Sequence, residues 1–219
     1  MSDVDEKAAH GVTTNWSVTR IVATGRLVPR SRPKHRRTTS HETQMHSYTD
    51  LALRNTDFIL GALEEVRTAA TEALQTSAAT SHVKALQAAQ LTKAIYAVGV
   101  FSIFEARLQD ALACKNGFSE AKDILAKSEN KALLGRFEDL YFAINALKHG
   151  KGTSYNALCA KADQLPFRVK LPDESFFNEG DVAEVVTLIE VDDKFVRYCS
   201  DTITEVSEVI RKERPDFIG

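Results

Sequence analysis

Four side chains in the second half of the chain are spaced like one face of a helix and include groups that could do acid–base chemistry. Glu138, Phe142, Asn145 and His149 follow one another at intervals of four, three and four residues. In a helix this spacing places them in a single stripe. Histidine exchanges a proton near neutral pH. The stripe is therefore a candidate catalytic surface, with His149 and Asn145 as catalytic residues and Glu138 as a supporting one.

Two lysines flank the histidine and could hold an anionic substrate. Lys148 precedes His149, and Lys151 follows it by two residues. The same residues also have a purely structural interpretation. Lys148 and His149 would complement the dipole at the C-terminal end of a helix, and Gly150 would end that helix. Spacing alone leaves both interpretations open.

Glu105 is a second candidate because its carboxylate lies in an apolar stretch. Its neighbours Phe101, Phe104 and Leu108 form the face that their helix should bury. A buried carboxylate is costly unless it is paired. We therefore expect a partner for Glu105 on the helix that ends at His149. The pair could support the candidate site, or it could be a structural hydrogen bond.

The sequence excludes several common catalytic and metal-binding motifs. The segment Gly150–Thr153 resembles a phosphate-binding loop, but that pattern needs glycine at position 145 and Ser or Thr at position 152. The segment His41–His46 has one residue too many for a zinc-binding H-E-x-x-H motif, and no G-x-S-x-G elbow is present. We expect neither a metal nor a cofactor.

The three cysteines are far apart and form no C-x-x-C pair. We expect them to be buried free thiols in a reducing cytoplasm. They are Cys114, Cys159 and Cys199.

The elements that carry these residues are helices. Apolar residues recur at three- and four-residue spacing and predict helices over residues 48–76, 82–115, 118–128 and 131–149, a short turn after 153, and a helical C-terminal part from 181. The first two are joined by a short polar turn, which predicts a long antiparallel pair. Prolines bracket residues 166–172, where we expect a short extended segment. The fold class is an all-α helical bundle.

Polar residues next to these stretches predict where the helices start. The expected N-caps are Ser47 or Thr49, Ser81, Ser119, Thr153 or Ser154, and Asp181. Asp181 and Glu184 together fit a capping box, in which the two side chains satisfy the first backbone N–H groups.

The charge of the chain is divided unevenly. Residues 1–44 carry eight Lys/Arg and four Asp/Glu, which leaves 20 and 26 of the chain's 28 and 30 for residues 45–219. We interpret residues 1–44 as a flexible basic tail and residues 45–219 as the bundle. The tail could contact nucleic acid, or it could be solvated and without function. Alternatively, translation could start at Met45.

The sequence predicts a cytoplasmic protein that does not cross a membrane. No run of about 18 apolar residues is long enough to span a bilayer. The acidic N-terminus has no apolar stretch and does not fit a secretory signal.

Two segments give the chain a resemblance to a known family. FSIFEA at Phe101–Ala106 lies on a long helix, and NALKHG at Asn145–Gly150 ends a later one. Over roughly residues 50–212 the chain resembles the HEPN superfamily. Members are all-helical, usually dimeric, and many are metal-independent ribonucleases of toxin and phage-defence systems. Their signature is an arginine, a polar residue, three to five further residues and a histidine; Asn145 and His149 match it, and Ile144 stands at the arginine position.

The resemblance implies a HEPN-like homodimer that acts on or near RNA in a stress or defence setting. The stripe of Glu138, Asn145 and His149, helped by Lys148 and Glu105, would face the second subunit and form a shared cleft. Without the arginine, only Lys148, Lys151 or a residue of the second subunit could hold the phosphate, and a lysine gives a point charge instead of a two-pronged contact. We therefore expect ribonuclease activity to be weakened or lost.

Two other functions stay open. The chain could be a non-catalytic helical module for protein–protein interaction, which the missing arginine and the acidic bundle favour. It could also be a bundle that binds a small molecule or nucleotide, an interpretation that depends only on Lys148 and Lys151.

Overall fold

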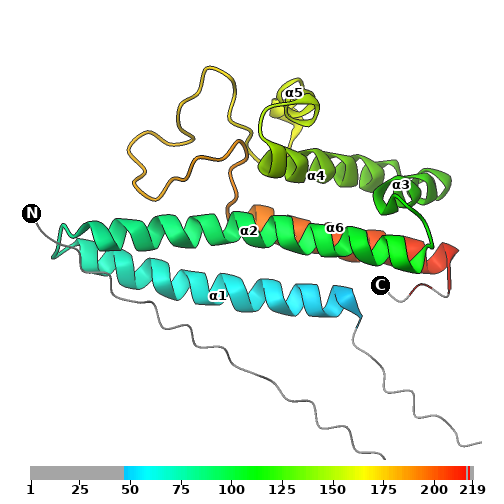
Figure 1. Cartoon of the computed structure of the whole chain (residues 1–219), viewed down its shortest axis with the longest axis horizontal. Coiled ribbons are helices and arrows are strands. Elements are labelled where there is room, and N and C mark those ends of the chain that lie inside the picture. The colour runs from blue at the N-terminus through cyan, green and yellow to red at the C-terminus, as the bar shows by residue number, and fades with distance from the viewer. Residues whose placement is uncertain (1–46, 216, 218–219) are drawn as a thin grey trace, which may run out of the picture. The chain divides into compact units, whose positions relative to one another are not determined.

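The computed structural model describes residues 47–215 and 217. All described residues belong to one compact unit, Thr43–Gly219. The predicted tail of residues 1–44 lies outside the described residues. The described part is all-α, as predicted, and contains these helices (Figure 1): α1 Tyr48–Leu74, α2 Thr80–Ala111, α3 Gly117–Lys127, α4 Lys131–His149, α5 Thr153–Cys159, the 3-10 turn η1 Ala162–Gln164, and α6 Asp193–Glu213.

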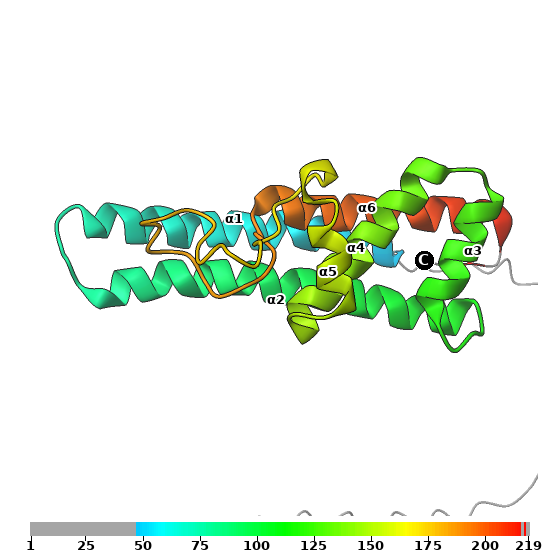
Figure 2. The same cartoon turned by 90° about the horizontal axis from the view of Figure 1, so that it is seen from above.

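The two longest helices form the predicted antiparallel pair. α1 and α2 run side by side in opposite directions (Figures 1 and 2). The hydroxyl of Tyr48 donates a 2.5 Å hydrogen bond to the carbonyl oxygen of Val100. Further along the pair, the hydroxyls of Thr56 and Tyr96 are 2.9 Å apart. These bonds between side chains of α1 and groups of α2 fix the register of the hairpin.

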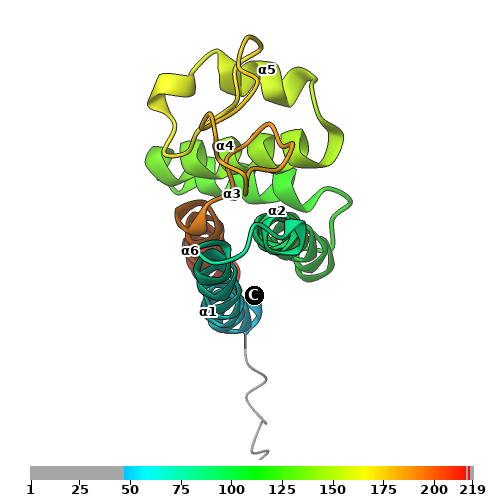
Figure 3. The ribbon, with the colours of Figure 1, turned by 90° about the vertical axis from the view of Figure 1, so that its left-hand side faces the viewer.

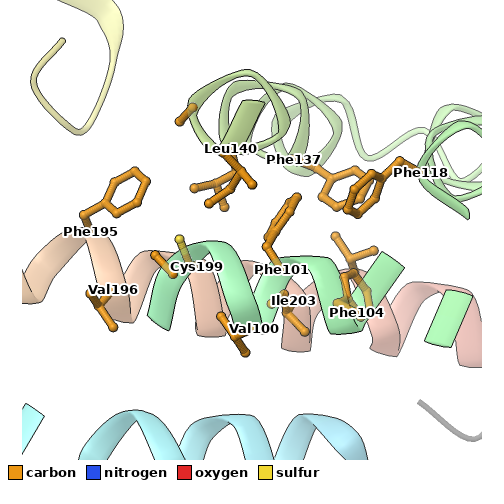
Figure 4. Packing of buried hydrophobic residues seen from close by; sticks show 14 of the residues in the cluster. Val100, Phe101, Phe104, Phe118, Phe137, Leu140, Phe195, Val196, Cys199 and Ile203 are labelled. Carbon is orange, nitrogen blue, oxygen red and sulfur yellow. The ribbon is translucent and has the colours of Figure 1, made fainter. Parts of the chain in front are cut away.

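α6 completes the core. It contacts α1, α2, α3 and α4, and seen end-on it lies beside α2, with α1 below the two and α3 and α4 above (Figure 3). Aromatic rings fill the space between the layers (Figure 4). The ring centroids of Phe101 and Phe137 are 5.8 Å apart, and those of Phe118 and Phe137 are 5.5 Å apart. Cys199 and Ile203 of α6 are also fully buried there.

Helix starts agree with the prediction in part. Ser47 caps α1 by accepting a hydrogen bond from the Asp50 backbone. α3 is capped by Asn116 instead of Ser119, and the N-cap positions of α2 and α5 are Ala79 and Gly152, neither of which makes a side-chain capping bond.

The segment before α6 is extended and irregular. Val169 and Ile189 form an isolated antiparallel bridge, which confirms the extended segment predicted near 166–172. The helix predicted from Asp181 is wrong, because α6 starts only at Asp193. Glu184 caps no helix; its carboxylate accepts hydrogen bonds from the side chain of Lys170 and from backbone N–H groups.

Two further properties follow from the described residues. All three cysteines are free thiols, but only Cys199 is buried; Cys114 and Cys159 are half-buried, which corrects the expectation for these two. No described helix has a stretch apolar enough and long enough to cross a membrane.

Candidate functional site

The candidate site lies where α4 ends. α4 starts after Asn130, whose side chain accepts a hydrogen bond from the Leu133 backbone, and its last residue is His149. Gly150 then takes a positive φ of 75°, which glycine adopts without strain, and its N–H donates to the Ala146 carbonyl at 2.9 Å. This turn redirects the chain across the end of α4 and brings Thr153 and Ser154 beside it.

The turn creates a depression of about 310 Å³ on the surface. Its walls come from one stripe of α4, from the loop that follows and from the first residues of α5. They are lined by Tyr141, Asn145, His149, Gly150, Lys151, Gly152, Thr153 and Ser154. Three of the residues singled out from the sequence, Asn145, His149 and Lys151, are thus brought together.

The remaining sequence candidates lie outside this depression. Lys148 is exposed and adjacent in the chain, but it is not part of the wall. Glu138, which lies two turns before Asn145 on α4, forms an ion pair of 3.7 Å with Lys122 of α3. That pair joins two helices, so Glu138 has a structural partner within the described part of the chain.

Glu105 differs from the expectation. Its side chain is half-buried, not buried, and no hydrogen bond or ion pair joins it to α4 within residues 47–215. Apolar periodicity places it beside Phe101 and Phe104, which are fully buried. It lies at the edge of their face, where water reaches the carboxylate, and so it needs no buried partner.

The position of the missing arginine is part of the core. Ile144 is 3% exposed and packs with the buried apolar residues. The nearest upstream arginine, Arg136, forms an ion pair with Glu205 of α6, and its Nη1 lies 2.9 Å from Glu205 Oε1. Arg136 is therefore held between helices, and the positive charge next to the depression comes from lysines.

Besides the two glycines of the turn, sequence reasoning missed three residues of the wall. The hydroxyl groups of Thr153 and Ser154 join the site only because the Gly150 turn folds the chain back. Tyr141 lies four residues before Asn145 and so shares its stripe, which was the available signal. The ring of Tyr141 also packs against Phe118, with a centroid distance of 5.4 Å, so Tyr141 belongs both to the wall of the depression and to the aromatic core.

The chemistry available here is proton exchange and anion binding. The wall offers an imidazole, a carboxamide, an ammonium group and hydroxyls, and the exposed Lys148 adds charge nearby. Over the described residues no three His, Cys, Asp or Glu side chains are grouped so that they could hold a metal ion.

Two larger hollows are built differently. One of about 430 Å³ is bounded by the extended segment and the start of α6, where Arg168 and Glu190 lie 3.8 Å apart. The other, of about 460 Å³, is an apolar groove between α1 and α2. The first is lined by paired charges and the second by aliphatic and aromatic side chains, so neither offers the proton-exchanging group that His149 gives to the smaller depression.

Comparisons with protein-family models, with curated proteins and with solved structures return no match.

Proposed function

We propose that this chain is a HEPN-like helical homodimer that acts on or near RNA in the cytoplasm, in a stress or defence setting. The observation that carries the proposal is the depression at the end of α4, because Asn145, His149 and Lys151 line it together. These are the two residues that match the family signature and one of the two lysines predicted to hold the phosphate.

The depression offers the groups that metal-independent RNA cleavage requires. In that reaction the 2′-oxygen attacks the adjacent phosphorus, the bond to the 5′-oxygen breaks, and a 2′,3′-cyclic phosphate and a 5′-hydroxyl are formed. His149 would accept the proton from the 2′-hydroxyl or deliver one to the leaving oxygen. Lys151 in the wall would face the charge that develops on the phosphate, and the exposed Lys148 would add positive charge nearby. Ile144 stands at the position where the family has an arginine, so the phosphate would lack a two-pronged contact with a guanidinium group. We therefore expect cleavage to be weakened or lost while RNA binding remains.

A second candidate is a non-catalytic module for protein–protein interaction. The observation that favours it is the number of exposed apolar side chains on α1 and α2, among them Phe58, Ile95 and Ile103. Contiguous exposed apolar surface is typical of protein–protein interaction sites.

The test is RNA binding and cleavage by the purified full chain in EDTA. Wild type would be compared with His149→Ala, Asn145→Ala and Lys151→Ala, and with His82→Ala and Lys212→Ala as matched controls outside the depression. We expect the three site variants to lose binding, and any cleavage, while the controls behave like wild type. Equal binding by the site variants, or no binding by wild type, would reject the proposal and favour the interaction module.

A further inference from the structure

Helix α2 is apolar on its outer side as well as on its core side. Towards the core, Phe101 and Phe104 are fully buried. On the other side Leu91, Ile95 and Ile103 are exposed, with 63% of Ile95 accessible. A helix that is apolar all round is normally covered all round. One side of α2 therefore lacks a cover within the described chain.

α1 extends this apolar surface. Leu51, Asn55 and Phe58 follow one another at intervals of four and three residues and share one side of α1, and Phe58 is 73% exposed. The groove between the two helices has a volume of about 460 Å³. It is lined by Tyr48, Leu51, Ala52, Asn55, Tyr96, Gly99, Val100 and Ile103.

Residues on the outer side of α2 can be paired at equal distances from the level of Ala97, which is itself buried on the core side. Ile95 and Gly99 lie two residues to either side of that level, and Leu91 and Ile103 lie six residues to either side. Ala88 and Ala106 lie at nine residues, and Lys84 and Asp110 at thirteen. When two identical helices pack antiparallel about a two-fold axis, positions at equal distances from the centre face each other.

We propose that the outer face of α2, widened by α1, binds a second copy of this chain in an antiparallel arrangement centred on Ala97. Ile95 of each copy then lies against Gly99 of the other, and Leu91 against Ile103. An added Cβ on Gly99 would meet nothing within 4 Å, so there is room above this glycine for a side chain from outside. The large side chain of Ile95 thus faces the small Gly99, and the two-fold axis repeats this contact.

Charge complementarity supports a second copy over an unrelated partner. Lys84 and Asp110 are both exposed, and neither forms an ion pair with a residue of the described part. The antiparallel arrangement brings Lys84 of each copy next to Asp110 of the other, so the apolar stripe ends in an opposite-charge pair on both sides. An unrelated partner would give no reason for opposite charges at the two ends of one stripe.

The length of the stripe suits a small but specific interface. From Ala88 to Ala106 the stripe, which also contains Thr92 and Ser102, extends about 27 Å at about 1.5 Å per residue. With α1 beside it, the surface is roughly 20 Å wide, since packed helices lie about 8–10 Å apart. This gives roughly 500 Å² per copy, or about 1,000 Å² in total, the lower limit for a specific interface.

The inference deepens the homodimer part of the proposed function, and it rests on that part. None of the residues of this interface lines the depression that contains His149. Each copy therefore keeps its own depression, in place of the shared cleft expected from the sequence. The test below uses no RNA, so it separates failure of the interface from failure of RNA binding.

The first experiment measures the mass of the full chain in solution by sedimentation or light scattering at micromolar concentration. We expect a mass of twice 24.2 kDa for wild type and of 24.2 kDa for Ile95→Asp. The dissociation constant of the Ile95→Asp dimer should rise by roughly 100-fold or more, because both copies carry the change. Val186→Asp, which alters a fully exposed apolar side chain in the segment before α6, should stay dimeric. Circular dichroism checks that helix content is retained. A monomeric wild type, or a dimeric Ile95→Asp, would overturn the proposal.

The second experiment tests the register and does not depend on placing a charge in the apolar stripe. Each single variant, Lys84→Asp or Asp110→Lys, places two like charges next to each other at both ends of the stripe. Each should weaken the dimer by roughly ten-fold at low salt. The double variant Lys84→Asp/Asp110→Lys restores opposite charges and should restore the affinity of wild type. If the double variant is as weak as the two singles together, the antiparallel register centred on Ala97 is wrong.

Discussion

The hydroxyl of Tyr155 donates a 2.6 Å hydrogen bond to the backbone carbonyl oxygen of Lys170, fifteen residues later. Both residues are buried. The bond joins α5, which begins at the rim of the depression, to the extended segment around Val169. The ammonium group of Lys170 is in turn 2.7 Å from Glu184. Lys170 is thus held at its backbone and at its side chain, and this double contact fixes the irregular part of the chain against the bundle.

Replacing Tyr155 with Phe should lower the free energy of unfolding. The variant leaves the buried carbonyl oxygen of Lys170 without its donor, and such a loss costs about 1–3 kcal/mol. Urea unfolding followed by circular dichroism measures the change. Tyr198→Phe is the matched control, because the buried hydroxyl of Tyr198 has no hydrogen-bond partner within the described chain. A control as destabilised as Tyr155→Phe would contradict this account.

The stability of the protein should fall at high pH. Burial, followed by the effect of the neighbouring Cys159 thiol, raises the pKa of Tyr155 to about 12, and burial likewise raises the pKa of Tyr198 to about 12. A group with a raised pKa stabilises the fold fully below its unfolded pKa of about 10, and this contribution is lost as the pH rises through the folded value. Unfolding measured from pH 9 to pH 12 should show this decline. The Tyr155→Phe variant should decline less steeply, and an identical slope would contradict the assignment.

The ion pair between Lys170 and Glu184 should make the protein less stable in acid. Burial by itself would raise the pKa of Glu184, but the hydrogen bonds from Lys170, Phe177 and Asn178 and the charge of Lys170 lower it below its usual value. A lowered pKa stabilises the fold above the unfolded value, and this stability is lost as the pH falls through the folded value. The acid-dependent part of the unfolding free energy should shrink in Glu184→Gln.

A double-mutant cycle isolates the same pair at neutral pH. Glu184→Leu strands a buried ammonium group and should cost about 3–5 kcal/mol, whereas Lys170→Met/Glu184→Leu removes both charges and should recover most of that loss. Additive effects of Lys170→Met and Glu184→Leu would show that the two side chains do not interact.

Gly117 should not tolerate a side chain, because α2 and α3 meet closely there. A Cβ at this position would lie 2.7 Å from Leu108 Cβ and 2.8 Å from the backbone oxygen of Glu105. Gly117→Ala should therefore destabilise the fold by about 1–3 kcal/mol in urea or thermal unfolding. Gly135→Ala in α4 is the matched control, since nothing lies within 4 Å of an added Cβ. That control should stabilise by about 0.4–1 kcal/mol.

The cysteines should differ in their reactivity towards thiol reagents. Cys199 is completely buried, and burial raises the pKa of its thiol well above the usual value. The reactive thiolate of Cys199 is thus both scarce and inaccessible. Under native conditions near pH 8 we expect two thiols, Cys114 and Cys159, to react with a disulfide reagent, and the third to react only after unfolding. Rapid native labelling of Cys199, mapped by mass spectrometry, would contradict the buried core.

The helices were predictable because their signals are local. Apolar spacing and Gly150 predict a helix over residues 131–149, and α4 has these bounds. The helix expected from Asp181 fails because its capping box is also local, whereas Glu184 is used by Lys170, fourteen residues earlier in the chain. A short-range pattern cannot show that a carboxylate is taken by a distant ammonium group.

The part of the candidate site that lies on one helix was predictable from the sequence, and the part that depends on a turn was not. Spacing along one helix brings Asn145 and His149 together, and both line the depression. Thr153 and Ser154 reach it through the backbone turn at Gly150, whose direction no periodicity reveals. Periodicity likewise cannot separate the edge of an apolar face from its centre, which is why Glu105 was expected to be buried.

The position of α6 between the other helices has a consequence for synthesis of the protein on the ribosome. α6 supplies Cys199, Ile203 and other buried side chains to the core that α1, α2 and α4 share. Some eighty residues separate the end of α2 from the start of α6, which takes roughly 4–16 s at about 5–20 residues per second. During this interval the nascent hairpin of α1 and α2 exposes both its apolar sides, so we expect it to be a substrate for chaperones until α6 emerges.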